Sequence, residues 1–266
     1  MSYESPAVTK AIRVVELLCE SPVPLSQAEI GRRLGLNGNM TFRLLRTLER
    51  AAWVVKHESG GYTMGLRPFH HTSKPVARLD IRAAGAAPVR DLWQTTGQST
   101  YLGVLDNLHV LYLEHLDATG PLKIAAQVGG RYELHCSAPG KVLLAYGGAA
   151  LLDRVIAARP RKHTDQTITT RQRLKAELRQ VAEQGYALDR EEYADGLMCF
   201  AAPIWNYEDR VVGTVGISVL TLHYSMDQMT VDLGPRVLAA ATAISTALGS
   251  SVTGEAAEPL TIEGTS

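Results

Sequence analysis

The chain has 266 residues and a formal net charge of zero, with 45% hydrophobic and 20% charged residues. That length allows one large or two ordinary domains, and the composition is typical of a soluble globular protein. The zero net charge excludes a uniformly basic nucleic-acid binder but allows a locally basic surface. The three cysteines (Cys19, Cys136 and Cys199) are widely spaced, which favours a reducing cytoplasm over a disulfide framework. No signal core or membrane-spanning apolar run occurs, so we expect a cytoplasmic chain without membrane contact.

Residues 5–66 predict three short helices followed by a β-hairpin. The first helix has an apolar stripe formed by Val8, Ile12, Val15 and Leu18. In the second, "SQAE" predicts a capping box in which Ser26 caps the helix and Glu29 reaches back, while Gly35 ends it. A third helix over about residues 39–51 follows at once, and "WVVK" and "YTMG" flank a glycine-rich turn. Together these elements predict a winged helix-turn-helix.

The third helix separates apolar from basic residues. Its predicted inner side is formed by Thr41, Leu44, Leu45 and Leu48. Its predicted outer side is formed by Asn39, Arg43, Arg46 and Arg50. An arginine face of this kind can contact phosphates and guanine edges in the major groove, although a merely solvated basic face is the alternative. The residues predicted to contact DNA are Ser26, Gln27, Asn37, Asn39, Met40, Thr41, Phe42, Arg43, Arg46, Thr47, Arg50, Lys56 and Tyr62.

The rest of the chain mixes strands and separate helices. We expect a linker helix region over residues 67–80, a domain over 81–249 and a disordered tail over 250–266. Helices are predicted over residues 76–96 (ended or kinked by Pro88), 140–146, 150–159, 171–184 and 226–248. Strands are predicted over residues 100–105, 109–116, 122–128, 198–206 and 211–220. This order predicts an α+β fold with a mainly antiparallel sheet flanked by helices.

The sequence resembles the IclR family of bacterial transcriptional regulators. The resemblance lies in "PLSQAEIGRRLGLNGNMTFRLLRTLERAAWV", in "LHCSAPGK" and in the spacing of Gly185, Asp189, Glu192 and Cys199, and it covers roughly residues 5–249. It implies a winged helix-turn-helix joined by a linker helix to a GAF-like effector domain, in a dimer or dimer of dimers. One departure is Gly216, which stands where some relatives carry a pocket serine.

The segment "GYALDREEYADGLMCFAAPI" allows three interpretations. A cysteine nucleophile would need an activating histidine or cation, but Cys199 lies in an apolar strand that favours a neutral thiol. A metal site would need clustered ligands, and the His and Cys residues are scattered in sequence, so we expect neither metal nor cofactor. A ligand pocket fits better. Asp189 is expected to point inward, and Glu191, Glu192 and Asp195 are expected to be solvated.

The predicted pocket has apolar walls that include Val215 and hydrogen-bonding groups near the start of a helix at "SAPGK", whose free amides would favour an anion. By resemblance and by residue type, the residues predicted to bind the effector are Leu134, His135, Cys136, Ser137, Ala138, Asp189, Met198, Cys199, Ala201, Gly216 and Ser218.

We therefore predict a sequence-specific transcriptional regulator, possessing no enzyme activity, whose binding to a double-stranded DNA operator is modulated by a small-molecule effector. The resemblance implies a carboxylate or aromatic acid as effector, and the sequence leaves open whether the regulator is a repressor or an activator. Two alternatives stay open: a GAF-like sensor whose first domain contacts proteins, and a cysteine-dependent enzyme.

Overall fold

A computed structural model describes residues 5–68, 80–121, 123–250 and 252. The chain divides into two compact units, residues 1–78 and 79–266. Most of the predicted linker region and most of the predicted tail lie outside the described residues. Val76, the predicted start of the linker helix, also lies outside the described residues.

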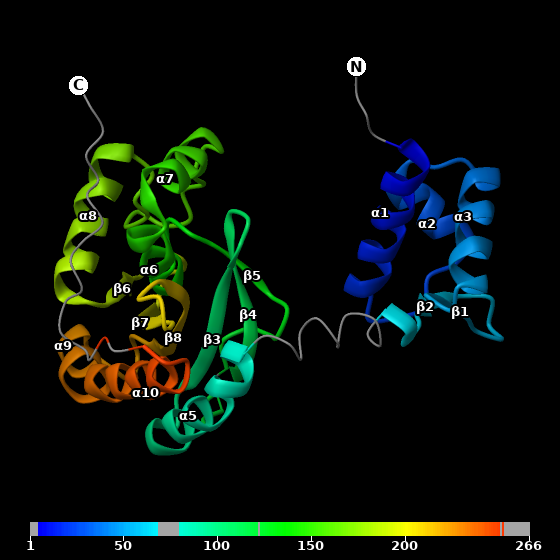
Figure 1. The fold of residues 1–266 in the computed structure, drawn as a ribbon. Helices are drawn as coiled ribbons and strands as arrows, with labels where there is room; N and C mark the ends of the chain where they lie inside the picture. The colour runs from blue at the N-terminus through cyan, green and yellow to red at the C-terminus, as the bar shows by residue number, and fades with distance from the viewer. Residues whose placement is uncertain (1–4, 69–79, 122, 251, 253–266) are drawn as a thin grey trace. The chain divides into compact units, whose positions relative to one another are not determined.

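The elements described in the first unit include the helices α1, α2 and α3 and a short hairpin (Figure 1). Its elements are α1 (Pro6–Glu20), α2 (Gln27–Leu34), α3 (Gly38–Arg50), β1 (Val54–Lys56) and β2 (Tyr62–Met64). The core consists of one face of each helix together with the hairpin, including Val14, Ile30, Leu45 and Val54, which are almost completely buried. The order of elements agrees with the predicted winged helix-turn-helix.

The second unit is built on a six-stranded antiparallel sheet of order β5-β4-β3-β8-β7-β6. Its strands are β3 (Ser99–Asp106), β4 (His109–Leu116), β5 (Arg131–Glu133), β6 (Ala187–Arg190), β7 (Leu197–Trp205) and β8 (Val211–Leu220). Its helices are α5 (Asp80–Thr96), α6 (Ala138–Tyr146), α7 (Gly148–Ala157), α8 (Arg171–Gln184), α9 (Met226–Gln228) and α10 (Gly234–Ala247). A π-helical turn, Met229–Leu233, separates α9 from α10. The α+β prediction is confirmed.

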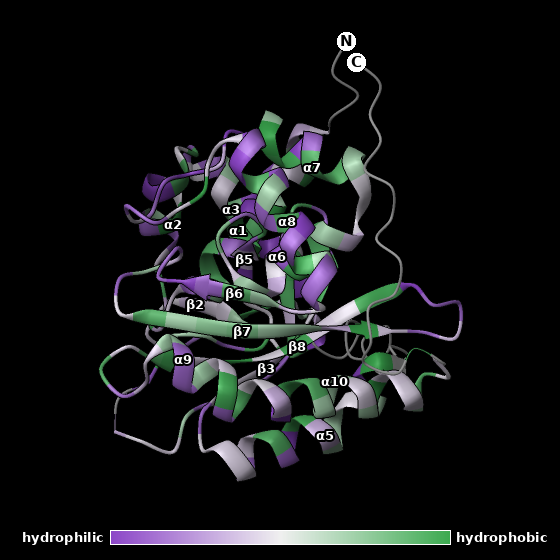
Figure 2. Ribbon diagram, turned by 90° about the vertical axis from the view of Figure 1, so that its left-hand side faces the viewer, coloured by the Kyte–Doolittle hydropathy of each residue, from purple (hydrophilic) through white to green (hydrophobic). Residues whose placement is uncertain are grey.

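Helices cover both faces of this sheet, as Figure 2 shows with α5 and α10 on one side and α6, α7 and α8 on the other. Each face therefore has its own core. Tyr101, Cys199 and Ala201 pack toward α6, whereas Phe200 and Ile217 pack toward α5 and α10. Because neighbouring residues of a strand point to opposite faces, a one-residue step along β7 moves a side chain from one core to the other.

Three predicted details of this unit are wrong. The segment over residues 122–128 forms no strand in its described part, and the third strand is the shorter Arg131–Glu133. Of the two outcomes predicted for Pro88, the end of the helix is wrong, since α5 continues to Thr96, and the kink stays a prediction. The last helix is interrupted by the π-helical turn, although Ser225 and Gln228 form the capping box that starts it.

Candidate DNA-reading face and effector site

The turn between α2 and α3 is fixed by its own caps. The Ser26 hydroxyl accepts a hydrogen bond from the Glu29 amide, and Asn37 does the same for the Met40 amide at the start of α3. Gly35 ends α2 with φ of 66°, a left-handed conformation in which a side chain is strained. The Gln27 side chain donates to the Gly38 carbonyl and joins the two helices. These contacts set the angle at which α3 is presented.

One side of α3 is exposed and basic. Among the residues predicted on this face, those exposed to solvent are Asn39, Phe42, Arg43, Arg46, Thr47 and Arg50. Arg46 forms an ion pair with Glu49 at 2.9 Å, and both side chains are accessible, so the pair contributes little to stability. In the described part of the chain, the Arg43 and Arg50 side chains form no hydrogen bond or ion pair. They are therefore available to phosphates or base edges.

Two predicted DNA contacts lie inside the unit. Thr41 has no exposed surface, and its hydroxyl donates to the Asn37 carbonyl within α3. Tyr62 is 3% exposed and belongs to the core, where its backbone pairs with Leu25. The structure therefore separates both from the exposed face, because α3 and the hairpin need them for packing. The exposed Lys56 lies over the Tyr62 ring at 5.8 Å, at the edge of the wing.

The predicted capping box of α2 is only half formed. Ser26 caps the helix, but the Glu29 carboxylate accepts from Arg32 and Arg33 in place of the Ser26 amide. Glu29 thus pairs with both arginines and offsets one of their two positive charges. The basic surface is therefore centred on α3 and not on α2.

An apolar groove lies beside the basic face. The predicted stripe on α1 is only partly buried, since Val8 and Ile12 are about half exposed. With Met40 and Trp53 they line a groove of about 570 Å³, whose wall also includes Arg43. An exposed apolar groove therefore adjoins the candidate reading face.

In the second unit, a polar row crosses four neighbouring strands on the face that packs against α6. The strand register pairs Asp189 with Cys199, Cys199 with Ser218, and Ser218 with Ser99. All four are buried. Cys199 Sγ lies 3.1 Å from Ser218 Oγ. Burial, and then the charge of Asp189, raise the pKa of Cys199 well above that of a free thiol, as expected for a neutral thiol and not a nucleophile.

Asp189 is the strongest candidate for a ligand contact. Its Oδ1 accepts from the amides of Glu192 at 2.7 Å and Tyr193 at 3.4 Å. Its Oδ2 is buried and has no hydrogen-bond partner in the described part of the chain. Burial, and then the charge of Glu192, raise the pKa of Asp189 to about 7. The carboxyl group can therefore carry a proton near neutral pH and donate it to an acceptor.

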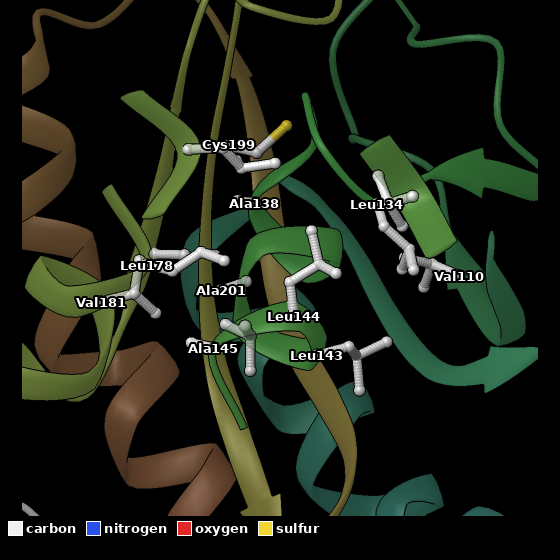
Figure 3. Packing of buried hydrophobic residues seen from close by; sticks show 14 of the residues in the cluster. Val110, Leu134, Ala138, Leu143, Leu144, Ala145, Leu178, Val181, Cys199 and Ala201 are labelled. Carbon is white, nitrogen blue, oxygen red and sulfur yellow. The ribbon is translucent and has the colours of Figure 1, made fainter. Parts of the chain in front are cut away.

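The loop before α6, which was predicted to line the effector site, is buried against this face of the sheet. Leu134, His135, Cys136, Ser137 and Ala138 are all buried. Figure 3 shows Leu134 and Ala138 in this cluster, with Ala138 near Cys199. The predicted excess of free amides is not present, because Pro139 has no N–H and the Gly140 amide donates to Ser137 Oγ. This turn therefore offers a ligand the Ala138 amide alone.

A second row contains small residues and one aromatic ring. The register aligns Ala187, Ala201, Gly216 and Tyr101 across the same four strands. A Cβ atom on Gly216 would lie 2.4 Å from the Tyr101 hydroxyl and 2.3 Å from the Phe200 carbonyl oxygen. The Tyr101 hydroxyl thus occupies the space into which a side chain at position 216 would project. Gly216 lies on this face, but it contributes space and no polar group.

The structure does not bring every predicted wall residue to this face. Met198 and Val215 pack in the core against α5 and α10, on the opposite side of the sheet from Cys199 and Ala201. The alternation of side chains along β7 and β8 is the physical reason. A cavity of about 290 Å³ at the end of the sheet is lined by Ser218 and Ser99 among others.

The sequence also assigned Glu192 to solvent, and this is wrong. Glu192 is 3% exposed and forms an ion pair at 2.5 Å with Lys141, which has no exposed surface. Lys141 also contacts Glu177 at 2.8 Å, and Glu177 in turn contacts Arg190. This network joins α6 and α8 to the strand that carries Asp189. The sequence analysis predicted neither the burial of Lys141 nor the ion pairs that connect α6, α8 and β6.

The comparison with known families is decisive. The family model described as bacterial transcriptional regulator IclR C-terminal matches residues 73–246, and the IclR helix-turn-helix domain matches residues 7–58.

The chain belongs to the IclR family.

Relatives of this IclR-family regulator align along nearly their whole length. HTH-type transcriptional regulator XynR of Escherichia coli is 31% identical over 245 residues, covering 91% of this chain and 97% of XynR. Transcriptional repressor IclR of the same organism is 26% identical, covering 91% and 90% of the two chains. These relatives are DNA-binding transcriptional regulators, which confirms the prediction that the chain is a regulator and not an enzyme.

Solved IclR-family structures share the fold. An IclR homolog from Microbacterium hydrocarbonoxydans, crystallised with 4-hydroxybenzoate, aligns with a TM-score of 0.81 at 22% identity, covering 91% of this chain and 98% of that one. That identity level supports the fold alone. No helix in the described ranges has both the length and the apolar character needed to cross a membrane.

A cluster of aromatic side chains that the sequence analysis did not predict lies near the polar row, on the face of the sheet that packs against α6. Tyr101 stacks on Tyr112 at 4.8 Å between ring centroids, and Tyr112 contacts Tyr132 at 4.3 Å. Tyr193, in the loop after β6, stacks on His163 at 5.5 Å. The alternation of "TYLGVL" and "HVLYLEHL" marks inward tyrosines on β3 and β4, but their meeting depends on strand register.

Proposed function

We propose that this regulator binds a specific operator through α3 and that a small organic acid, bound beside the Asp189–Cys199–Ser218 row, changes its affinity for that operator. The observation that carries the proposal is the buried Asp189 Oδ2, which has no partner in the described part of the chain. A buried polar atom of this kind costs free energy unless a ligand or water satisfies it.

The chemistry of the row favours an acceptor-rich ligand with an apolar body. The Cys199 thiol, the Ser218 hydroxyl and the Asp189 carboxyl in its protonated form can each donate a hydrogen bond to a carboxylate oxygen. The neighbouring Tyr101 and Tyr112 rings give an aromatic or other apolar portion a surface to contact. An aromatic acid satisfies both requirements, and 4-hydroxybenzoate is the first probe.

For DNA, we propose that Asn39, Arg43, Arg46 and Arg50 read an operator, with Lys56 on the adjacent backbone. Support comes from their shared exposed face and from the free Arg43 and Arg50 guanidinium groups. We also infer a dimer or dimer of dimers, which would place two α3 helices about 34–36 Å apart on a pseudo-palindromic site. The apolar groove beside Val8 and Ile12 offers a surface for such self-association. Repression is the proposed mode, as in the relative named a repressor.

The DNA part is tested by selecting bound fragments from a genomic library with the purified chain. Binding of the selected fragment is then measured by fluorescence anisotropy for the wild type, Arg43→Ala and Arg173→Ala. Arg173 is an exposed residue of α8. Arg173→Ala therefore removes the same charge as Arg43→Ala, but at a position outside the reading face. We expect Arg43→Ala to lose about 1–3 kcal/mol of discrimination against non-specific DNA and Arg173→Ala to lose none. Equal losses in both variants would refute the assignment.

The effector part is tested by calorimetry with 4-hydroxybenzoate and a panel of mono- and dicarboxylic acids. Ser218→Ala and Asp189→Asn are expected to weaken the acid that binds best while leaving operator affinity without the acid unchanged. Met198→Leu is the matched control, because Met198 lies in the opposite core. If both site variants bind the acid as tightly as the wild type, these residues do not form the site.

A further inference from the structure

Two loops of the second unit bring three metal-ligating side chains together. His135 and Cys136 precede α6, and His163 lies in the segment between α7 and α8. One ligand atom from each side chain lies within 4.8 Å of the other two. His135 and Cys136 are 3% and 0% exposed, and the His163 side chain is 18% exposed. The scattered sequence positions therefore converge at one buried place.

Both imidazoles are held in the orientation that metal-binding histidines adopt. His135 Nε2 donates to the Arg161 carbonyl oxygen at 2.8 Å, and His163 Nε2 lies 3.1 Å from Glu133 Oε1. Metal-binding histidines commonly donate their second ring N–H to a carbonyl or a carboxylate in this way. When His135 Nε2 donates its N–H to the Arg161 carbonyl, the lone pair of the neutral ring is on Nδ1. In the tautomer in which His163 Nε2 donates to Glu133, Nδ1 of His163 carries the lone pair in the same way.

The surroundings favour a cation. The carboxyl groups of Glu133, Asp189 and Glu192 lie close enough to the Cys136 thiol to act on it electrostatically. One oxygen of Asp189 and one of Glu192 are buried without a hydrogen-bond partner among the described residues. Lys141 is the one cation that acts in the opposite direction on this thiol. A divalent ion bound beside Glu133 would interact favourably with that carboxylate and would deprotonate the thiol as it binds.

We propose that His135 Nδ1, Cys136 Sγ and His163 Nδ1 bind one zinc ion, with the fourth position open to water or to the carboxylate of an effector. Two imidazole nitrogens and a thiolate suit zinc and exclude magnesium and calcium, which prefer oxygen ligands. Binding releases the Cys136 proton to solvent, so one proton leaves per zinc bound.

The observed spacing is compatible with this set after a small closure. Zinc–nitrogen and zinc–sulfur bonds of about 2.0–2.3 Å place tetrahedral donor atoms roughly 3.3–3.7 Å apart. One ligand atom of each of the three residues lies within 4.8 Å of the other two, so a movement of about an ångström brings such atoms to this spacing. The zinc site itself does not depend on the proposed function. The role of its fourth position does, because it assumes that an acid effector binds in this region.

The experiment uses the full chain, stripped of metal by a chelator and titrated with Co²⁺ as a spectroscopic substitute for zinc. We expect one cobalt per chain and a thiolate-to-cobalt charge-transfer band that stoichiometric Zn²⁺ removes. Cys136→Ser and His163→Gln are both expected to lose the band, and His163 is accessible enough that its variant folds even if Cys136→Ser does not. Cys19→Ser is the control, because Cys19 is an exposed thiol in the first unit. Glu133→Gln should weaken metal affinity by about 10–100-fold, since it removes the charge that orients His163.

The proposal is overturned if the wild type binds no stoichiometric cobalt, or if the band persists in both Cys136→Ser and His163→Gln. Its failure is distinguishable from that of the proposed function. A chain that binds no metal but still changes operator affinity on adding an acid keeps the regulator and loses the zinc site. A chain that binds zinc, but whose operator affinity is changed by no acid of the panel, keeps the zinc site and loses the proposed effector function.

Discussion

The protonation of Asp189 predicts an unusual dependence of stability on pH. Burial raises the pKa of Asp189 from an ordinary 3.8 to about 7. At pH values below 3.8, the Asp189 carboxyl is protonated in both the folded and the unfolded state. Between the two values the folded state keeps it and the unfolded state loses it, so the free energy of unfolding falls as pH rises. Above the folded pKa the carboxylate is charged in both states, and the full cost of burying it remains.

The size of the effect follows from the difference between the two pKa values. A difference of about 3 units corresponds to at most about 4 kcal/mol, of which about 3 kcal/mol falls between about pH 5 and about pH 8. Asp189→Asn removes the titration and keeps an Oδ1 that can accept from the Glu192 and Tyr193 amides. The variant should therefore gain stability relative to the wild type as pH rises.

The assay is urea unfolding at several pH values, with EDTA present, in a Trp53→Phe background. Trp93 and Trp205 then report the second unit alone. At each pH, the free energy of unfolding of the wild type is subtracted from that of the variant, and the change of this difference with pH is the result. Any packing effect of Asn that does not depend on pH cancels. A difference that stays flat within about 1 kcal/mol, or that shrinks as pH rises, would show that Asp189 is not a buried, proton-binding carboxyl.

Three further predictions concern single contacts. Gly216→Ser should destabilise the second unit by about 1–3 kcal/mol in urea unfolding, because its Cβ has no room; an unchanged midpoint would contradict the packing described here. Lys141→Met should cost about 3–5 kcal/mol by leaving Glu192 buried and unpaired, and adding Glu192→Gln should recover part of the loss by the same assay. Gly35→Ala should lower the stability of the first unit by about 1–2 kcal/mol in calorimetry, whereas Gly38→Ala, also in open space but without positive φ, should not.

The first unit was largely predictable because its signals are local. Ser26, Gly35 and Asn37 act within a few residues of themselves, and the helical period separates Arg43 from Leu45 without any tertiary information. The exception is Thr41, which the sequence placed both inside and on the reading face. A small polar residue at the edge of a helical stripe fits both roles, and the packing of α2 on α3 decides between them.

The second unit was predictable in its elements but not in its faces. The run "LMCFAAPI" is apolar throughout because helices cover both sides of the sheet, so no alternation shows which residues share a face with Cys199. Met198 was assigned to the pocket for that reason. The contacts of Lys141 with Glu192, and of His163 with His135, join segments far apart in the chain, and such pairs depend on strand register and loop paths.

The most direct test of a regulator with two coupled sites is the operator affinity measured by anisotropy with and without the best-binding acid of the panel. Thermodynamic reciprocity requires that the acid change the operator Kd by the same factor as the operator changes the Kd of the acid, and a factor of roughly 5–150 is expected. Matching factors in that range support the account. Operator and acid affinities that are each indifferent to the other ligand would contradict it.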